Sequence, residues 1–104
     1  MIRQFTVFEN PSPRSRDAAP YLMVVQSHFL DEMHTTLIAP LIRERDSGDF
    51  TRVSVAIDFA DERLDLSLAE MAPISRSALK RPLGDLKHRA DDIRRALDRL
   101  FTGF

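Results

Sequence analysis

The spacing of hydrophobic positions changes once along the chain, and the change separates a strand-rich part from a final helix. Apolar and polar residues alternate along 53–58 and again along 64–69, a period of two that is typical of half-buried strands. Residues 60–63 between them suffice for a turn, so the pair predicts a β-hairpin. From Leu86 onward the apolar positions recur every three or four residues, which predicts an amphipathic helix of about 16 residues.

Three segments upstream of the hairpin also favour strands. Residues 4–8 are aromatic and β-branched, and 22–26 form a continuous apolar run expected to be buried on both faces. Residues 35–39 form a third candidate, which we expect to stop at Pro40. A short edge strand is expected at 71–74. The pattern therefore predicts about five antiparallel strands followed by one C-terminal helix, an α+β fold that is mostly β.

Turn and cap residues mark the ends of these elements. Residues 9–17 contain two prolines and no apolar side chain before Ala18, and 43–49 are charged and end in a Ser-Gly-Asp turn, so both should be surface loops. Gly84 or Asp85 is a suitable N-cap for the helix, and Gly103 a suitable stop.

The predicted helix carries one apolar stripe and a charged remainder. Ion pairs across its turns are expected four residues apart, from Lys87 to Asp91 and from Asp91 to Arg95. The stripe that should face the sheet consists of Leu86, Ala90, Ile93, Leu97, Leu100 and Phe101.

Composition limits the classes of protein that fit this pattern. A chain of 104 residues corresponds to a single domain, 1–104, and the lack of cysteine excludes disulfides, thiolate zinc sites and cysteine nucleophiles. A net charge of −1 provides no global field for nucleic acid or anionic lipid. The first residues lack the apolar stretch of a secretory signal, and no window reaches the roughly 18 apolar residues of a membrane span. We therefore expect a cytoplasmic protein without a membrane partner.

The charge is balanced overall but not along the chain. Residues 75–99 hold eight basic and four acidic side chains, a local +4, so the rest of the chain carries −5. Two interpretations are open: a solvated helix face, or a docking surface for an acidic partner.

Sites for chemistry are weakly indicated. The segment from His28 to His34 holds four potential metal ligands, but its two histidines would lie some 20 Å apart on a strand, and a polar connection fits it better. His88 falls off the apolar stripe, and Asp91 and Asp92 point about 100° apart on a helix, so they cannot share a proton. The chain has no Gly-x-Ser-x-Gly elbow and no glycine-rich phosphate loop. We expect no metal, no cofactor and no enzymatic activity.

The last five residues, Leu100-Phe101-Thr102-Gly103-Phe104, include no charged side chain. Most domains end in a polar, poorly ordered tail. Phe104 therefore either packs into the core or serves as an exposed anchor for a partner.

The C-terminal third contains a series of short motifs that resemble one family in order and spacing, and weaker matches precede them. The chain resembles CcdB-type toxins, the toxic half of a toxin–antitoxin pair, over most of its length. The matching residues are Gln4-Phe5 with Val7, Val25-Gln26-Ser27, Leu37-Ile38-Ala39-Pro40-Leu41, Glu70-Met71-Ala72, Asp85-Leu86 with His88-Arg89, Asp92-Ile93 with Ala96-Leu97, and Phe101 with Gly103.

The resemblance implies a fold and a set of partners. The fold would be an SH3-like antiparallel β-sheet or barrel with one C-terminal α-helix, assembled as a homodimer. Members of the family bind the A subunit of DNA gyrase and trap its complex with cleaved DNA, and they are not enzymes. A small antitoxin with a disordered half neutralises the toxin, and the pair represses its own operon, so operator DNA is met only through the antitoxin complex. The local +4 region would suit an acidic antitoxin that folds on binding.

The chain departs from the family at its last residues. The well-known gyrase poisons end in tryptophan, glycine and isoleucine, which contact gyrase; the corresponding residues, and thus the expected gyrase-binding site, are Thr102, Gly103 and Phe104. The tryptophan stacks on an arginine of gyrase, a contact of order 1 kcal/mol or more, and threonine has no ring. Three hypotheses follow: a gyrase poison that uses Phe104, a non-toxic protein that keeps antitoxin binding and autoregulation, and an RNA-cleaving toxin.

Overall fold

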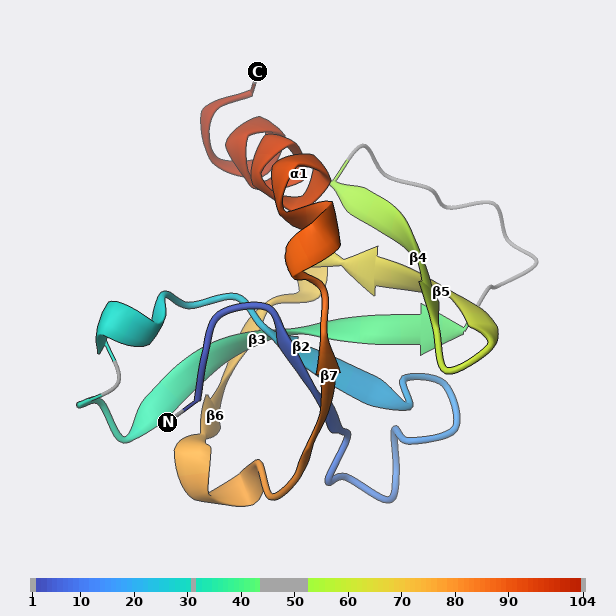
Figure 1. Cartoon of the computed structure of the whole chain (residues 1–104), viewed down its shortest axis with the longest axis vertical. Coiled ribbons are helices and arrows are strands. Elements are labelled where there is room, and N and C mark those ends of the chain that lie inside the picture. Colours follow the sequence, from blue (N-terminus) through green and yellow to red (C-terminus); the bar gives the residue numbers. More distant parts are fainter. Residues whose placement is uncertain (1, 31, 44–52, 104) are drawn as a thin grey trace.

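The computed structural model describes residues 2–30, 32–43 and 53–103. Antiparallel strands form most of the regular secondary structure in the described residues, and one α-helix follows them (Figure 1). The strands are β1 (Thr6–Glu9), β2 (Tyr21–Val24), β3 (Thr35–Arg43), β4 (Ser54–Phe59), β5 (Glu62–Ser67), β6 (Ala72–Ser75) and β7 (Pro82–Asp85). The helix is α1 (Ala90–Thr102), and the 3₁₀ turns are η1 (His28–Leu30), η2 (Leu68–Glu70), η3 (Arg76–Ala78) and η4 (Lys87–Arg89).

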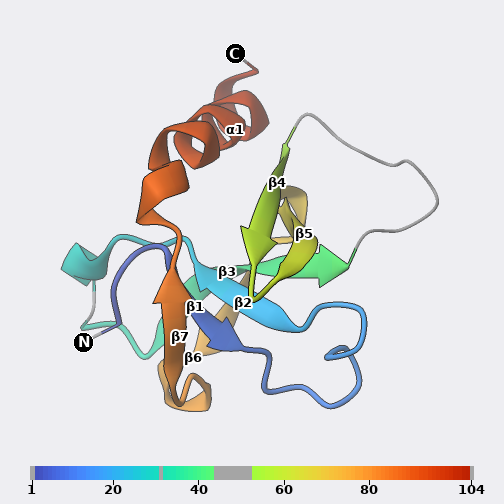
Figure 2. The ribbon, with the colours of Figure 1, turned by 45° about the vertical axis from the view of Figure 1, so that its right-hand side comes forward.

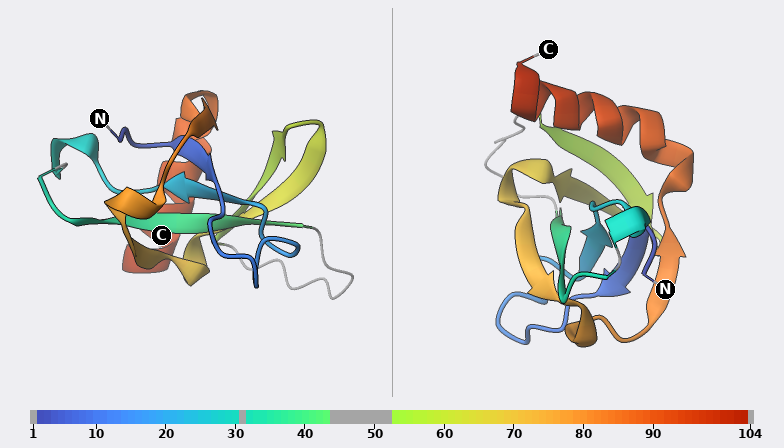
Figure 3. Two further views of the ribbon diagram at one scale, coloured as in Figure 1. Left: turned by 90° about the horizontal axis from the view of Figure 1, so that it is seen from below. Right: turned by 90° about the vertical axis from the view of Figure 1, so that its left-hand side faces the viewer.

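The strands form one curled sheet in the order β4-β5-β3-β2-β1-β7, with β6 also paired to β3. β3 is the central strand. One of its edges pairs with β2, and the other pairs with β5 from Leu41 onward and with β6 up to Ile38. The helix α1 lies across one end of the curled sheet (Figures 2 and 3). The predicted α+β fold, mostly antiparallel β with one C-terminal helix, is confirmed.

Two apolar cores lie on the two faces of the sheet. Val7 and Met23 belong to the core beneath α1, whereas Phe8, Leu22 and Val24 belong to a second core on the opposite face. Because successive strand residues point to opposite faces, a strand that contributes to both cores is apolar at every position. The continuous apolar run predicted as a strand buried on both faces is explained in this way.

The third strand does not stop at Pro40, as the sequence suggested. β3 continues to Arg43, and Pro40 pairs with Leu22 of β2. A proline lacks the N–H that a sheet ladder uses, but Pro40 lies where the other edge of β3 changes partner, between Ile38 opposite β6 and Leu41 opposite β5. The missing donor is tolerated at that junction.

The first strand begins two residues later than predicted, and β7 was not predicted at all. Phe5 adopts a φ of 70°, which turns the chain before β1 starts at Thr6. β7 has no apolar alternation, yet it pairs with β1 and places Gly84 opposite Val7. Gly84 is therefore a strand residue and not an N-cap. The Asp85 carboxylate accepts the Lys87 N–H at 3.0 Å, but the N-cap position is Leu86 for η4 and Arg89 for α1, so Asp85 is not the helix N-cap either.

The hairpin and the edge strand β6 form as predicted, with a tighter hairpin turn than expected. Ala60 and Asp61 alone connect β4 to β5, with φ of 53° and 60°, in the manner of a type I′ turn. The helix ends at Gly103, whose φ is 80° and whose N–H donates to Arg99 O at 3.1 Å. The helix acids pair with arginines three residues on, not four, as in Asp91–Arg94 at 3.7 Å.

The two predicted surface loops have different outcomes. Residues 10–20 connect β1 to β2 and include all of the predicted loop 9–17 except Glu9, which ends β1. Residues 43–49 lie outside the described residues except for Arg43, which ends β3. The Arg43 guanidinium donates to Asp17 O and to the Glu62 carboxylate, 2.5 Å from Nε. The hydrogen bond that Arg43 donates to the Glu62 carboxylate raises the pKa of Arg43, and it joins β3 to β5.

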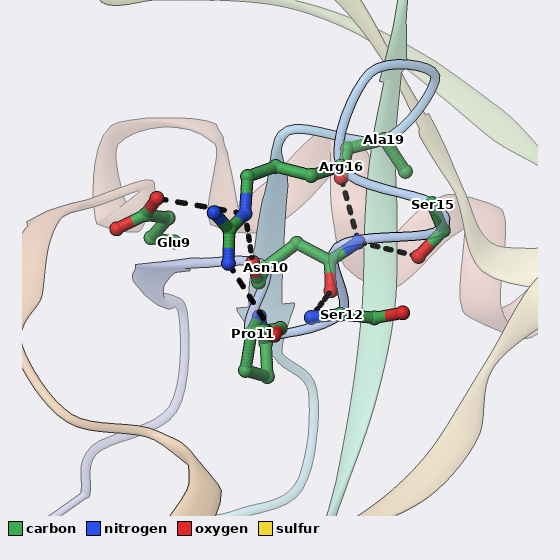
Figure 4. A network of polar contacts seen from close by, with 7 residues as sticks. All are labelled: Glu9, Asn10, Pro11, Ser12, Ser15, Arg16 and Ala19. Atoms are coloured by element: carbon green, nitrogen blue, oxygen red, sulfur yellow. Dashed lines mark hydrogen bonds and ion pairs between the residues drawn. The ribbon is translucent and has the colours of Figure 1, made fainter.

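The loop between β1 and β2 is organised by the buried side chain of Asn10 (Figure 4). Its Nδ2 donates to Ser15 Oγ at 2.9 Å and to Ala19 O at 2.8 Å, and its Oδ1 accepts the Ser12 N–H at 3.0 Å. Arg16 Nε donates to the Asn10 carbonyl at 2.9 Å. Although the loop is polar, it adopts a defined conformation because its backbone N–H and C=O groups form hydrogen bonds within the loop.

Candidate protein-docking site at the end of α1

The helix is held on the sheet through one face. Ile93 and Ala96 are fully buried in the core, and Leu97 and Leu100 are half-buried against it. The last turn therefore has a fixed position, and it lies at the extremity of the molecule opposite β6 and η3 (Figure 1). A binding site at this end is presented on a regular element and not on a tail.

Phe101 is the main difference between the expected and the observed helix. The sequence placed it on the buried stripe, but 71% of its surface is exposed. At about 100° per residue, Phe101 lies about 80° around the helix from Ile93, at the flank of the face that Ile93, Ala96 and Leu97 share. It also lies in the last turn, where the neighbouring residues 102 and 103 are exposed. Phe101 is therefore an exposed ring and not a core residue. Its position in the last turn, at the flank of the stripe, was the signal in the sequence.

The predicted site residues meet at this end. Thr102 is the last residue of α1; it is exposed, and its hydroxyl donates to Asp98 O at 2.6 Å within the helix. Gly103 is exposed, and its left-handed backbone turns the chain at the helix end. Phe104 lies outside the described residues. Thr102 and Gly103 are thus consecutive exposed residues at the helix end, and the exposed ring of Phe101, which sequence reasoning did not include among the site residues, precedes them.

The basic C-terminal region is divided between two places. Lys80 and Arg81 lie beside η3, while Arg95 and Arg99 lie on α1 at the other end of the molecule (Figure 1). Arg94 is engaged internally, since its guanidinium carbon lies 5.6 Å from the centroid of the Phe5 ring. The basic region, for which a solvated helix face and a docking surface were both open, is therefore divided between these two places.

A second exposed apolar feature lies at η1, between β2 and β3. Phe29 is 85% exposed, and Leu30 and Met33 are about half exposed. The His28 ring lies 4.7 Å from the Phe29 ring and within 3.3 Å of Arg3 Nη2. The potential metal ligands of 28–34 drew attention away from the apolar side chains of this segment, whose position in a short polar connection was the available signal.

Among the described residues, those weighed for catalysis or metal binding do not converge; Asp31 of the segment from His28 to His34 lies outside that part of the chain. Within the described ranges no group of three or more histidine and acidic side chains is placed to hold a metal ion. His88 is exposed on η4, and the Asp91 and Asp92 carboxylates contact different arginines, Arg94 and Arg89. No helix in this part of the chain is long and apolar enough to cross a membrane.

Comparison with known proteins relates this chain to one family and its fold to a solved structure. A family model described as CcdB protein matches residues 4–103. No curated protein matches the sequence. Among solved structures, the chain is similar to an endoribonuclease in complex with its cognate antitoxin from Mycobacterial species, with a TM-score of 0.73 and 14% identity over 92% of this chain and 90% of that one. At that identity the likeness shows a common fold. Because the family model covers nearly the whole chain, the chain belongs to the CcdB family, the toxins of toxin–antitoxin systems.

Proposed function

We propose that this toxin binds the A subunit of DNA gyrase through the end of α1 and traps the complex of gyrase with cleaved DNA. It acts in the cytoplasm as a homodimer and catalyses no reaction itself. A small cognate antitoxin neutralises it, and the two together repress their operon, so that the toxin reaches operator DNA only within that complex. The observation that carries the proposal is the exposed Phe101 ring next to Thr102 and Gly103, at the position where the family contacts gyrase.

The exposed ring provides the interaction that Thr102 cannot. Burying a phenylalanine side chain at an interface contributes about 1.5–3 kcal/mol, and a cation over its face adds about 0.5–2 kcal/mol. The Thr102 hydroxyl is already bonded to Asp98 O, and threonine has no π-face. We therefore assign the principal contact to Phe101, with Gly103 and Phe104 beside it.

Thr102 also supports a second candidate function. A family member without the terminal tryptophan can retain antitoxin binding and autoregulation without poisoning gyrase. The two candidates differ in one observable, the amount of cleaved DNA that accumulates when gyrase acts on supercoiled plasmid in the presence of the protein.

The deciding experiment uses purified full-length protein, DNA gyrase and supercoiled plasmid, with cleaved DNA released by detergent and protease. Linear DNA that increases with protein concentration supports the gyrase proposal. If the wild-type protein gives none and Thr102→Trp does, the protein is a non-toxic member whose loss lies at that residue. If neither traps gyrase, the end of α1 is not a gyrase-binding site.

An RNA-cleaving activity stands as the third hypothesis. The endoribonuclease of similar fold motivates it, although the likeness concerns the fold. Incubation of the protein with long RNA and mapping of the 5′ ends tests it directly. Cuts at a defined sequence that disappear when an antitoxin is added would replace the gyrase proposal.

A further inference from the structure

A polar groove separates the helix from the edge of the hairpin. It encloses about 320 Å³ and lies between β4 on one side and η4 with α1 on the other. Three arginines and one aspartate give it a net positive charge. Its lining residues are Ser54, Val55, Ala56, Arg89, Asp92, Arg95 and Arg99.

The side chains of the groove are arranged by helix geometry and by one anchoring arginine. Asp92, Arg95 and Arg99 are spaced three and four residues apart, so they share one face of α1. Arg89 Nη1 donates to Ala56 O at 2.8 Å, and its Nε lies 3.0 Å from Asp92 Oδ2, which ties the helix start to β4. Arg95 is held loosely, 3.8 Å from Asp92 Oδ1, and its side chain is 71% exposed. Arg95 is thus accessible to a ligand that enters the groove.

An acidic cavity adjoins the groove along the same strand. It encloses about 610 Å³ on the β4–β5 hairpin, and Ala56 lines both spaces. Four of its side chains are acidic and one, Arg63, is basic; Glu62 pairs with Arg43, and Asp58 pairs with Arg63. Its lining residues are Ala56, Asp58, Asp61, Glu62, Arg63, Leu64 and Asp65.

The charge changes from positive in the groove to negative in the cavity over a short distance along β4. Ser54 in the groove and Asp58 in the cavity are four strand residues apart, which corresponds to about 13 Å. A nucleic acid carries a negative charge at every phosphate, so a strand that entered the groove would be repelled at the cavity. A peptide can change sign between neighbouring residues, so the charge pattern favours a protein segment.

We propose that the groove and the cavity together bind one extended segment of the antitoxin, with an acidic residue among Arg89, Arg95 and Arg99 and a basic residue about four positions away at Asp58. The inference rests on the proposed function, because it takes the antitoxin as the partner. It adds the place on the toxin and the charge pattern that the partner must carry.

The test uses a synthetic peptide as the probe. A ten-residue peptide with glutamates in one half and lysines in the other is titrated into ¹⁵N-labelled full-length protein, beside an all-glutamate peptide, an all-lysine peptide and single-stranded RNA of ten nucleotides. The bipolar peptide should bind most tightly. Its shifts should be confined to amides of 54–58, 61–65 and 89–99.

Charge reversals on the helix supply a matched pair. Arg95→Glu should weaken binding of the bipolar peptide about fivefold or more, because it removes one ion pair and adds a repulsion. Arg94→Glu changes the net charge equally but lies at a different angle, beside Phe5, and should leave the affinity within twofold. Asp58→Lys should weaken the bipolar peptide and leave the all-glutamate peptide unweakened.

Three results would overturn the inference. They are equal effects of Arg94→Glu and Arg95→Glu, tighter binding of RNA than of the bipolar peptide at these amides, and shifts that fall elsewhere or fail to appear at millimolar peptide. The gyrase cleavage assay is independent of this titration. A protein that binds the peptide but does not trap gyrase would contradict the proposed toxicity and leave the groove assignment standing.

Discussion

Ala60 occupies a left-handed backbone conformation that glycine adopts without strain, and replacing it should stabilise the protein. Its φ is 53°, in a two-residue turn where Asp61 also has positive φ. The left-handed conformation destabilises the folded state of a non-glycine residue by about 1–2 kcal/mol. Glycine avoids this cost, but it lowers the free energy of unfolding by about 0.4–1 kcal/mol because it makes the unfolded chain more flexible. The difference predicts that Ala60→Gly raises the free energy of unfolding by about 0.5–1 kcal/mol.

The assay is urea denaturation followed by circular dichroism, with thermal unfolding in parallel. A gain of that size corresponds to an increase in Tm of about 2–8 °C for a domain of this length. The matched control is Ala56→Gly, the same substitution within β4 at negative φ, which should cost about 0.5–1 kcal/mol. Destabilisation by Ala60→Gly, or equal effects of the two variants, would refute the turn assignment and the strain argument.

Two further substitutions test the packing of β7 and the loop after β1. A Cβ on Gly84 would lie 3.1 Å from Phe59 Cε1, so Gly84→Ala should lower the free energy of unfolding by about 1 kcal/mol, and a Phe59→Leu background should remove most of that loss in a double-mutant cycle. Asn10→Ala leaves the Ala19 carbonyl and the Ser12 N–H without their side-chain partner and should cost about 1–3 kcal/mol in urea denaturation. An unchanged midpoint for Asn10→Ala would show that the loop does not depend on this side chain.

The elements predicted well from sequence are those whose signal is local. The alternation along β4 and β5 and the three-to-four spacing from Leu86 each arise from residues near one another in the chain, and Gly103 ends the helix through its own backbone. β7 gave no such signal, because its side chains are exposed and its position is set by pairing with β1, more than seventy residues away. The prediction that β3 stops at Pro40 was wrong for the same reason. A proline is tolerated there because the edge of β3 changes partner from β6 to β5 at that point, which local sequence does not show.

The candidate sites show the same division between local and distant information. Thr102 and Gly103 were identified from the end of the sequence, and the structure places both at the exposed helix terminus. Phe101 was assigned to the core because it follows Leu97 by one turn, but it lies at the flank of the apolar stripe in the last turn, and its ring is exposed. The arginine groove combines β4 with residues of α1 more than thirty positions later, so no local pattern predicts it.

The measurement that most directly tests the central claim is the concentration of protein that gives half-maximal gyrase–DNA cleavage, compared between wild type, Phe101→Ala and Leu83→Ala. Leu83 is also an exposed apolar residue, 46% exposed, but it lies on β7 away from the end of α1. Loss of an aromatic anchor worth about 2 kcal/mol corresponds to a shift of about thirtyfold, so Phe101→Ala should require that much more protein while Leu83→Ala matches wild type. Wild-type cleavage that Phe101→Ala leaves unchanged would contradict the assignment of the end of α1 as the gyrase-binding site.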